Sequence, residues 1–168
     1  MRNYKIKDIS EIINGSTPST TNISFWNGDI TWLTPKDLTN FSKRFIYQGH
    51  ASITENGYAS CSTKLVPQGT ILLSSRAPIG YLAIAGKDLC TNQGFKSLIC
   101  KKELVNNLYL YYWLSTNVEY LQSISSGATF KELSKDTLEN VEINLPSLEI
   151  QQHIVNINKR RLNYAIFN

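Results

Sequence analysis

Cysteine and histidine are scarce in this 168-residue chain, which argues against several kinds of site. The three cysteines, Cys61, Cys90 and Cys100, are odd in number and far apart, so neither a disulfide framework nor a zinc site fits their spacing. We interpret them as buried or incidental thiols. The two histidines, His50 and His153, lie in different parts of the chain, which disfavours a metal site and a Cys-His nucleophile pair. The sequence therefore predicts no bound metal.

The motifs of common nucleotide-dependent enzymes are also missing. No glycine-rich phosphate loop of the P-loop or dinucleotide type occurs. The chain also lacks the glycine-rich turn and the Asn/Asp-Pro-Pro-Tyr/Phe tetrad that methyltransferases using S-adenosylmethionine usually carry. A nuclease needs clustered acids for its metal, whereas Asp29, Asp37, Glu55 and Asp88 stand singly in turns, where Asp is common. These absences argue against a stand-alone methyltransferase or nuclease, and the sequence predicts no cofactor.

Long apolar segments are absent as well. No run approaches the roughly 20 residues of a transmembrane helix, and the N-terminus lacks the apolar centre of a signal peptide. We therefore expect a cytoplasmic protein with no membrane association. The composition, 42% apolar and 18% charged, is that of a globular domain. A net charge of +4 is compatible with nucleic-acid binding but does not demonstrate it.

Residue patterns predict an α/β (α+β) domain with a curled, mostly antiparallel sheet and short helices. Segments rich in β-forming residues, separated by short turns, indicate strands at 29–33, 70–74, 81–85, 96–100 and 141–145. Helical periodicity and capping residues indicate helices at 8–14, 108–121 and 135–139. Pro146 ends the last strand, and Ser147 can cap a final helix.

The final helix is expected to project from the domain. Its residues Ile150, Ile154, Ile157, Arg161 and Tyr164 follow at alternating four- and three-residue steps, which is the spacing of a coiled-coil seam with one polar interruption. A helix this short is marginal alone, and an exposed apolar stripe usually marks an interface. We therefore divide the chain into a domain at 1–146 and a helix at 147–168. We expect Ile150, Ile154 and Ile157 to contact a partner.

Polar and cationic residues gather in several loops. Such side chains, on loops and at the ends of elements, are the groups that contact DNA bases and phosphates. Taken singly, each loop could equally be a solvated surface loop. The candidate DNA-binding residues are Thr17, Ser19, Lys36, Lys43, Arg44, Lys64, Arg76, Asn92, Gln93 and Lys131.

The chain resembles the DNA-specificity subunits of type I restriction-modification enzymes. The segments that carry this resemblance occur in the order of the family and together span nearly the whole chain. They are residues 4–9 (YKIKDI), 15–19 (GSTPS), 26–32 (WNGDITW), 65–80 (LVPQGTILLSSRAPIG), 91–95 (TNQGF) and 127–152 (GATFKELSKDTLENVEINLPSLEIQQ).

The resemblance implies a target-recognition domain that reads double-stranded DNA without catalysis. Its implied partners are a modification subunit, which methylates adenine, and a restriction subunit. Base reading in the family concentrates in a variable region that corresponds to 36–64, whereas the loops at 15–19 and 91–95 suit backbone contact or scaffolding.

A full subunit of this family usually has two recognition domains and two long spacer helices in antiparallel contact. This chain matches one recognition domain and about the first half of one spacer helix, so the resemblance implies a half-subunit or a shortened form. A homodimer through the helix, reading an inverted repeat, is one expected arrangement. The alternative is an interaction or regulatory protein that acts mainly through its helix and binds DNA weakly.

Overall fold

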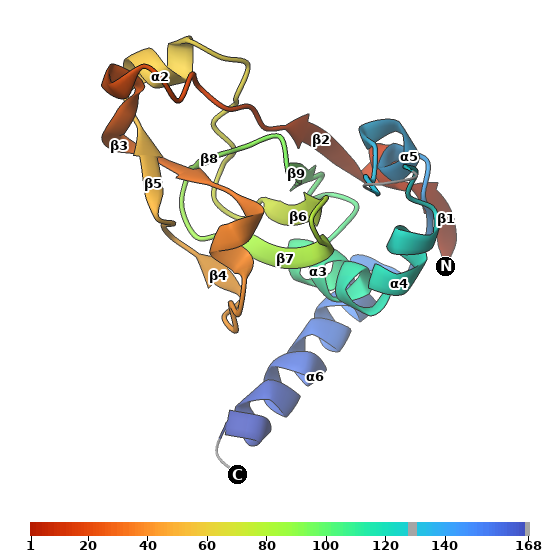
Figure 1. The fold of residues 1–168 in the computed structure, drawn as a ribbon. Coiled ribbons are helices and arrows are strands. Elements are labelled where there is room, and N and C mark those ends of the chain that lie inside the picture. Colours follow the sequence, from red (N-terminus) through yellow and green to blue (C-terminus); the bar gives the residue numbers. More distant parts are fainter. Residues whose placement is uncertain (128–130, 167–168) are drawn as a thin grey trace.

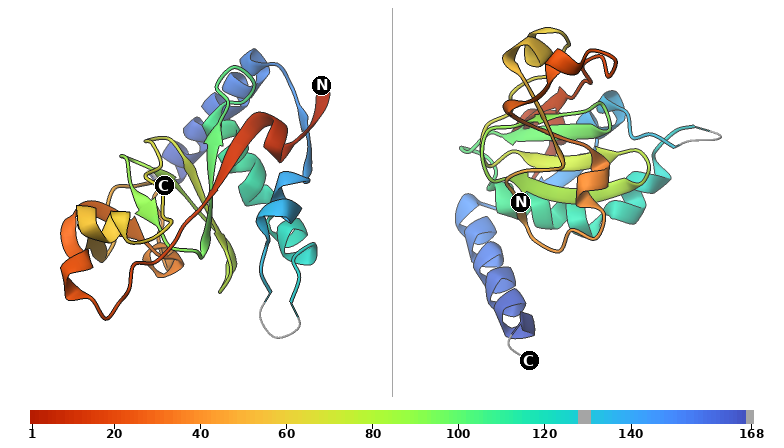
Figure 2. Two further views of the ribbon diagram at one scale, coloured as in Figure 1. Left: turned by 90° about the horizontal axis from the view of Figure 1, so that it is seen from above. Right: turned by 60° about the vertical axis from the view of Figure 1, so that its left-hand side comes forward.

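A computed structural model describes residues 1–127 and 131–166 of the chain, with side chains described as far as Lys159 (Figure 1). Three small sheets and several short helices form the body of the molecule, and one long helix, α6 (Leu148–Ile166), points away from it. The right-hand view of Figure 2 shows the same projection. The structure therefore confirms a mixed α/β fold with antiparallel sheets, short helices and a projecting C-terminal helix.

The central sheet has five strands in the order β2-β9-β6-β7-β4, and all neighbours are antiparallel except the pair of β7 and β4. Its strands are β2 (Ser10–Asn14), β4 (Phe45–Ile46), β6 (Ile71–Ser75), β7 (Ile79–Ala85) and β9 (Phe95–Cys100). The strands predicted at 70–74, 81–85 and 96–100 are therefore confirmed, with boundaries that differ by no more than two residues.

Two smaller sheets flank the central one, so the single sheet of the prediction is divided into three. β1 (Arg2–Lys5) pairs antiparallel with β10 (Glu142–Leu145), which is the strand predicted at 141–145. β3 (Trp26–Leu33), which contains the strand predicted at 29–33, lies antiparallel to one neighbour and parallel to the other. These two neighbours are β5 (Ala51–Ile53) and β8 (Cys90–Thr91). Together with α2 (Glu55–Ala59) and the 3-10 helix η1 (Ile23–Phe25), β3 and β5 form the lobe at the upper left of Figure 1.

Two consecutive helices, α3 (Asn107–Thr116) and α4 (Val118–Ser123), lie against the central sheet (Figure 1). Leu110, Leu114 and Leu121 of these helices are fully buried in the main hydrophobic core. Full burial of one such side chain typically stabilises a fold by about 1.5–3 kcal/mol. The burial of these three leucines therefore stabilises the packing of both helices on the sheet.

The helix predicted at 8–14 is wrong. Only Ile6–Ile9 is helical (α1), and the following residues form β2, which pairs with β9 along its whole length. Ser10 and Ile12 are buried while Glu11 is exposed, which is the alternation of a strand with one face on the core. The backbone partners at 96–100 are far away in the sequence, so local periodicity could not reveal them.

The helix predicted at 108–121 is present but broken in two. Asn117 lies between α3 and α4 with ψ of 18°, and its side chain donates a 2.7 Å hydrogen bond to the carbonyl of Trp113. The first helix begins at Asn107 and is capped by Asn106, one residue earlier than expected. The helix predicted at 135–139 is confirmed as α5 (Lys135–Glu139).

A buried amide anchors the base of α6. Gln151 is completely buried. Its side chain accepts a hydrogen bond of 2.8 Å from the backbone N–H of Asn106 and donates to the carbonyls of Leu104 (3.1 Å) and Pro146 (3.0 Å). Val155, one turn further along, is also fully buried. The first turns of α6 are therefore fixed to the start of α3.

An adjacent face of α6 carries the predicted apolar seam. Ile150 and Ile157 are 51% and 41% exposed, and Ile154 is half-buried. None of the three belongs to a core cluster among the described residues. The side chains of Arg161 and Tyr164, which were predicted to continue the seam, lie outside the described residues.

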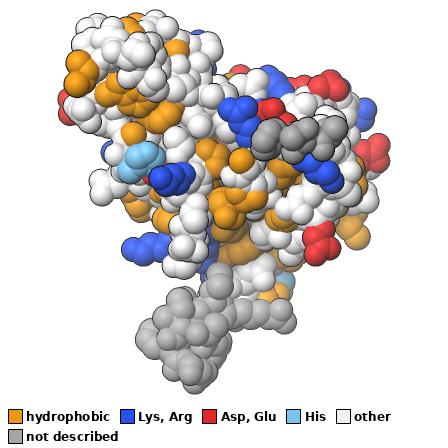
Figure 3. Space-filling view, in the orientation of Figure 1, with side chains coloured by type: hydrophobic (Ala, Val, Ile, Leu, Met, Phe, Trp, Pro, Cys, Tyr) orange, Lys and Arg blue, Asp and Glu red, His pale blue; other side chains and the backbone are white. Residues whose placement is uncertain are grey.

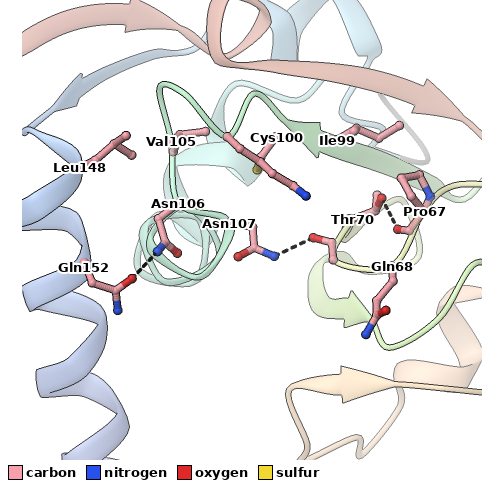
Figure 4. Close-up of a pocket in the computed structure, with 12 residues that line it drawn as sticks. Pro67, Gln68, Thr70, Ile99, Cys100, Val105, Asn106, Asn107, Leu148 and Gln152 are labelled. Atoms are coloured by element: carbon pink, nitrogen blue, oxygen red, sulfur yellow. Dashed lines mark hydrogen bonds between the residues drawn. The ribbon is translucent and has the colours of Figure 1, made fainter.

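A pocket of about 540 Å³ lies between α6, the start of α3 and the turn at 67–70 (Figure 4). Asn106 donates to Gln152 across one side (3.0 Å), and Asn107 donates to the carbonyl of Gly69 across the other (2.9 Å). These hydrogen bonds connect the base of α6 to the central sheet through the two asparagines.

Candidate nucleic-acid interface

The polar loops of the domain meet around one turn, Thr91–Gly94, which connects β8 to β9. Gly15 and Ser16 approach it from the N-terminal side, and the N–H of Ser16 donates to the carbonyl of Thr91 (3.0 Å). The hydroxyl of Thr17 donates to the side-chain oxygen of Gln93 (2.5 Å). A β-carbon on Gly15 would lie 2.1 Å from the carbonyl oxygen of Asn92, so only glycine permits this approach.

Two tryptophans hold the hydroxyl-rich loop in place. Trp32 donates its indole N–H to the carbonyl of Ser16 (2.9 Å), and Trp26 donates to the carbonyl of Ser19 (3.1 Å). Their rings meet edge to face with centroids 5.0 Å apart. The two indole groups therefore fix the loop that carries Thr17 and Ser19.

Two more segments reach the same turn. The hydroxyl of Thr63 donates to the carbonyl of Thr91 (3.0 Å), which brings the exposed Lys64 nearby. The N–H of Asn92 donates to the carbonyl of Leu33 (2.8 Å), just before η2 (Pro35–Leu38), which carries the exposed Lys36.

Asp37 stabilises the segment that carries Lys36. Its carboxylate accepts hydrogen bonds from the backbone N–H of Thr34 (2.8 Å) and of His50 (2.9 Å), and lies 2.6 Å from the imidazole of His50. Burial acts to raise the pKa of Asp37, but the hydrogen bonds from Thr34 and His50 outweigh it and lower the pKa. The interpretation of Asp37 as a turn acid is consistent with these contacts.

The C-terminal end of β6 connects the turn to a cationic pocket. Ser75 donates to the carbonyl of Gly94 through its N–H (2.8 Å) and accepts from the N–H of Leu133 (2.9 Å). Its neighbours Arg76 and Lys131 line one pocket of about 510 Å³, which we call the Arg76 pocket. The other lining residues are Ala77, Pro78, Ile79, Gln122 and Glu132.

Eight of the ten candidate residues therefore come from segments joined to a single turn or to its immediate neighbours. They are Thr17, Ser19, Lys36, Lys64, Arg76, Asn92, Gln93 and Lys131. On the face shown in Figure 3, Lys and Arg side chains are dispersed among polar and hydrophobic ones and form no continuous basic patch. On this face, an interaction with an anion would rest on local contacts.

Lys43 and Arg44 lie apart from this cluster, on the connection between η2 and β4. The carbonyl of Arg44 accepts from the N–H of Ile84 (2.8 Å), and its guanidinium carbon lies 5.6 Å from the ring centroid of Tyr112 in α3. This cation–π contact directs the Arg44 side chain towards Tyr112. Within the described parts of the chain, no hydrogen bond or ion pair connects Lys43 or Arg44 to the turn at 91–94.

One charged residue near the turn was not identified from the sequence. Lys96 is only 5% exposed, and its ammonium lies 3.5 Å from the carboxylate of Glu132. Burial lowers the pKa of Lys96, whereas the charge of Glu132 opposes this shift and that of Arg76 adds to it. The single signal in the sequence was a lysine inside a mostly apolar strand. Because lysines are far more often solvated than buried, this signal did not predict burial.

Two of the three thiols are held in their unreactive form, and the described residues contain no metal cluster. Burial raises the pKa of the Cys90 thiol to about 11 and that of Cys100 to about 12, so both are protonated near neutral pH. Across residues 1–127 and 131–166, no group of three or more His, Cys, Asp or Glu side chains could hold a metal. In the same ranges, no helix is both long and apolar enough to cross a membrane.

The fold and the loop cluster define a mixed α/β domain that presents polar and cationic loops and projects a helix. The family model of the type I restriction modification DNA specificity domain matches residues 1–163. The chain belongs to this family.

Two curated relatives illustrate the relationship. The chain is 52% identical over 155 residues to the type I restriction enzyme MjaIX specificity subunit of Methanocaldococcus jannaschii, a match that covers 91% of the chain and 36% of the relative. It is 31% identical to the HindI specificity subunit of Haemophilus influenzae, over 97% of the chain and 36% of that relative. The chain thus spans about a third of the length of these relatives.

Solved structures share the fold. The HsdS subunit from Thermoanaerobacter tengcongensis superposes with a TM-score of 0.75 at 23% identity, over 97% of this chain and 37% of that one. A chain from a structure described as the basis of complex assembly and conformational transition of the type I R-M system gives a TM-score of 0.79 at 24% identity, over 99% of this chain and 39% of that one.

Proposed function

We propose that this domain recognises a specific double-stranded DNA sequence for a type I restriction-modification system. In this role it directs a modification subunit, and with it a restriction subunit, to the target. The observation that carries the proposal is the convergence of loops on the turn at 91–94, in a chain that belongs to the DNA specificity family. Hydroxyl, amide and cationic groups on converging loops are the groups that contact phosphates and base edges.

The domain contributes recognition in this proposal, and the partner subunits contribute the chemistry. The protonated, buried thiols and the single turn acids of the described residues suit a scaffold better than an active site. No cofactor is needed for such a role. A DNA-directed module of this kind would act in the cytoplasm.

Phosphate contact and base reading can be separated by two arginine variants. We expect Arg76→Ala to weaken binding to every duplex alike and to reduce the slope of log K against log salt by about one unit, because one phosphate contact is lost. Arg44 lies outside the cluster around the turn at 91–94, but it belongs to the region 36–64 in which we expect base reading. We therefore expect Arg44→Ala to reduce discrimination against a wrong base at one position by roughly 1–3 kcal/mol. Affinities for the target and for random duplex, measured at two salt concentrations in the assembled methyltransferase, distinguish these outcomes.

Arg2→Ala is the matched control for both variants, because Arg2 is an exposed arginine on β1 that pairs with β10 at a different sheet. It should leave both affinities unchanged. If Arg44→Ala and Arg76→Ala bind both duplexes as the parent does, the proposed reading surface is wrong. If the parent binds the modification subunit through α6 but binds no duplex even at low salt, the protein is an interaction protein.

We further propose that the chain divides into a recognition domain at 1–146 and a partner-binding helix at 147–168. The exposed seam of Ile150 and Ile157 supports a second copy of the chain or a helix of the modification subunit as the partner. Two copies related by a two-fold axis would read an inverted repeat, because protein symmetry is mirrored in the DNA site.

A charge placed on the seam tests this arrangement. We expect the parent to self-associate weakly at high concentration and Ile157→Asp to sediment as a monomer, since the seam is short. Ile23→Asp is the control, because Ile23 is 83% exposed on η1, far along the chain from α6. The helix is not a partner-binding surface if the parent remains strictly monomeric and Ile157→Asp does not change its affinity for the modification subunit.

A further inference from the structure

Hydrogen bonds fix the backbone around the Arg76 pocket. On one side, the hydroxyl of the fully buried Ser74 donates to the carbonyl of Pro78 (2.7 Å) and accepts from the N–H of Tyr81 (2.8 Å), so it closes the turn after Arg76. The amide of Gln122, from α4, donates to the carbonyl of Ile79 (2.9 Å). The backbone that presents Arg76 is therefore held from two directions.

The other wall is tied to the sheet. Glu132 and Ser126 exchange backbone hydrogen bonds of 2.8 and 3.2 Å, and the next residue, Leu133, donates to the carbonyl of Ser75 (2.9 Å). These bonds place Glu132 and its neighbour Lys131 opposite the turn that carries Arg76.

The charged residues that line the pocket are two cations, Arg76 and Lys131, and one carboxylate, that of Glu132. The ammonium of the buried Lys96 lies 3.5 Å from this carboxylate but does not line the pocket. Among the described side chains, neither Arg76 nor Lys131 forms an ion pair, and Lys96 has Glu132 as its one salt-bridge partner. The Glu132 side chain is 44% exposed, whereas that of Lys96 is 7% exposed. Lys131 is exposed and Arg76 is half-buried, so both can meet a ligand from solvent, whereas the buried Lys96 can act on it only through Glu132.

We propose that the Arg76 pocket binds one phosphate of the DNA backbone, and that the pair of Lys96 and Glu132 sets the strength of that contact. The proposal rests on the proposed function. Arg76 can donate two parallel hydrogen bonds to a phosphate, and Lys131 adds a point charge. Glu132 would repel the phosphate, and Lys96 offsets this repulsion from beneath the carboxylate. Lys96 is therefore a positioning residue, and Glu132 is a negative element that limits non-specific affinity.

The proposal predicts binding changes of opposite sign for the two partners of one ion pair. Glu132→Gln keeps the shape of the side chain and removes its charge, so affinity for random duplex at low salt should rise roughly threefold to tenfold, the effect of one nearby unit charge. Lys96→Met leaves the carboxylate uncompensated, so affinity should fall by a similar factor. The double variant Lys96→Met, Glu132→Gln should have an affinity close to that of the parent. Adding Arg76→Ala to Glu132→Gln should abolish the gain in affinity.

Glu139→Gln is the matched control, because Glu139 also pairs with a lysine, Lys135 at 3.6 Å, but does not line the pocket. It should leave affinity unchanged. Thermal unfolding of each variant shows whether it is folded at the temperature of the assay. If the ion pair were purely structural, both single variants would lose affinity for the duplex. If Lys96→Met does not fold, the affinity of Glu132→Gln alone tests the proposal.

The outcomes separate this inference from the proposed function. If the parent chain does not bind random duplex at low salt, the proposed function fails and the pocket assignment fails with it. If the parent binds but Glu132→Gln leaves its affinity and salt slope unchanged, only the pocket assignment fails. Thermal stabilisation by inorganic phosphate that Arg76→Ala removes, without any effect of Glu132→Gln on duplex affinity, would assign the pocket to free phosphate and overturn the DNA assignment.

Discussion

Replacing Gly15 with alanine is expected to destabilise the domain and to disrupt the loop cluster at once. The new β-carbon would lie 2.1 Å from the carbonyl oxygen of Asn92 and 2.3 Å from that of Thr91. Both are backbone atoms, so the overlap can be relieved only by moving the turn at 91–94 away from β2. Overpacking of this kind typically costs about 1–3 kcal/mol, and we expect a loss at the upper end of this range in urea unfolding.

The same displacement should weaken duplex binding, because it breaks the hydrogen bond between Thr17 and Gln93. Asn14→Ala is the control, since Asn14 is an exposed neighbour on the same strand and its loss should change the free energy of unfolding by no more than about 0.5 kcal/mol. A Gly15→Ala variant as stable as this control would show that the approach of the two segments is not a constraint.

Replacing Gln151 with methionine should cost about 2–4 kcal/mol of stability and loosen the projecting helix. Methionine preserves the volume of the side chain but leaves the N–H of Asn106 and the carbonyls of Leu104 and Pro146 without their partner. A buried polar group without a hydrogen bond typically costs about 1–3 kcal/mol, although water can relieve part of this cost. Denaturant unfolding gives the energy, and limited proteolysis within 148–159 reports whether the helix has come loose.

The adjacent Gln152→Met is the matched control. Gln152 is exposed, and its contacts are side-chain hydrogen bonds to Asn106 and Asn156. Its replacement should change stability by less than about 1 kcal/mol. Equal effects of the two substitutions would mean that the buried amide has no special role in anchoring α6.

The sequence was sufficient to predict elements whose limits depend on residues that are close together in the chain. Pro146 and Ser147 marked the end of β10 and the start of α6, and the isoleucine spacing identified a face of α6 that the structure leaves largely exposed. At 8–14 it was insufficient, since seven residues hold too little periodicity to separate helix from strand. The deciding partners, 96–100, lie more than 80 residues away.

The chemistry of the side chains was enough to select the candidate residues, but not to predict which of them lie together in space. That Thr17 meets Gln93, and that Arg76 and Lys131 share a pocket, depends on contacts that span more than 50 residues of sequence. The separation of Arg44 depends on Tyr112, whose position follows from the packing of α3. Lys96 was missed for the same reason, because the burial of a lysine depends on where its carboxylate partner is placed.

The anchoring of α6 by Gln151 has a geometric consequence for any assembly that reads two DNA half-sites. A 19-residue helix is a lever of roughly 28 Å, at 1.5 Å per residue. A tilt of about 10° at its base would displace its far end by roughly 5 Å, close to one helical turn. On DNA, with about 3.4 Å per base pair, this displacement exceeds one base-pair step. In such an assembly, the hydrogen bonds of Gln151 would fix the angle of α6 and, through it, the spacing between the half-sites.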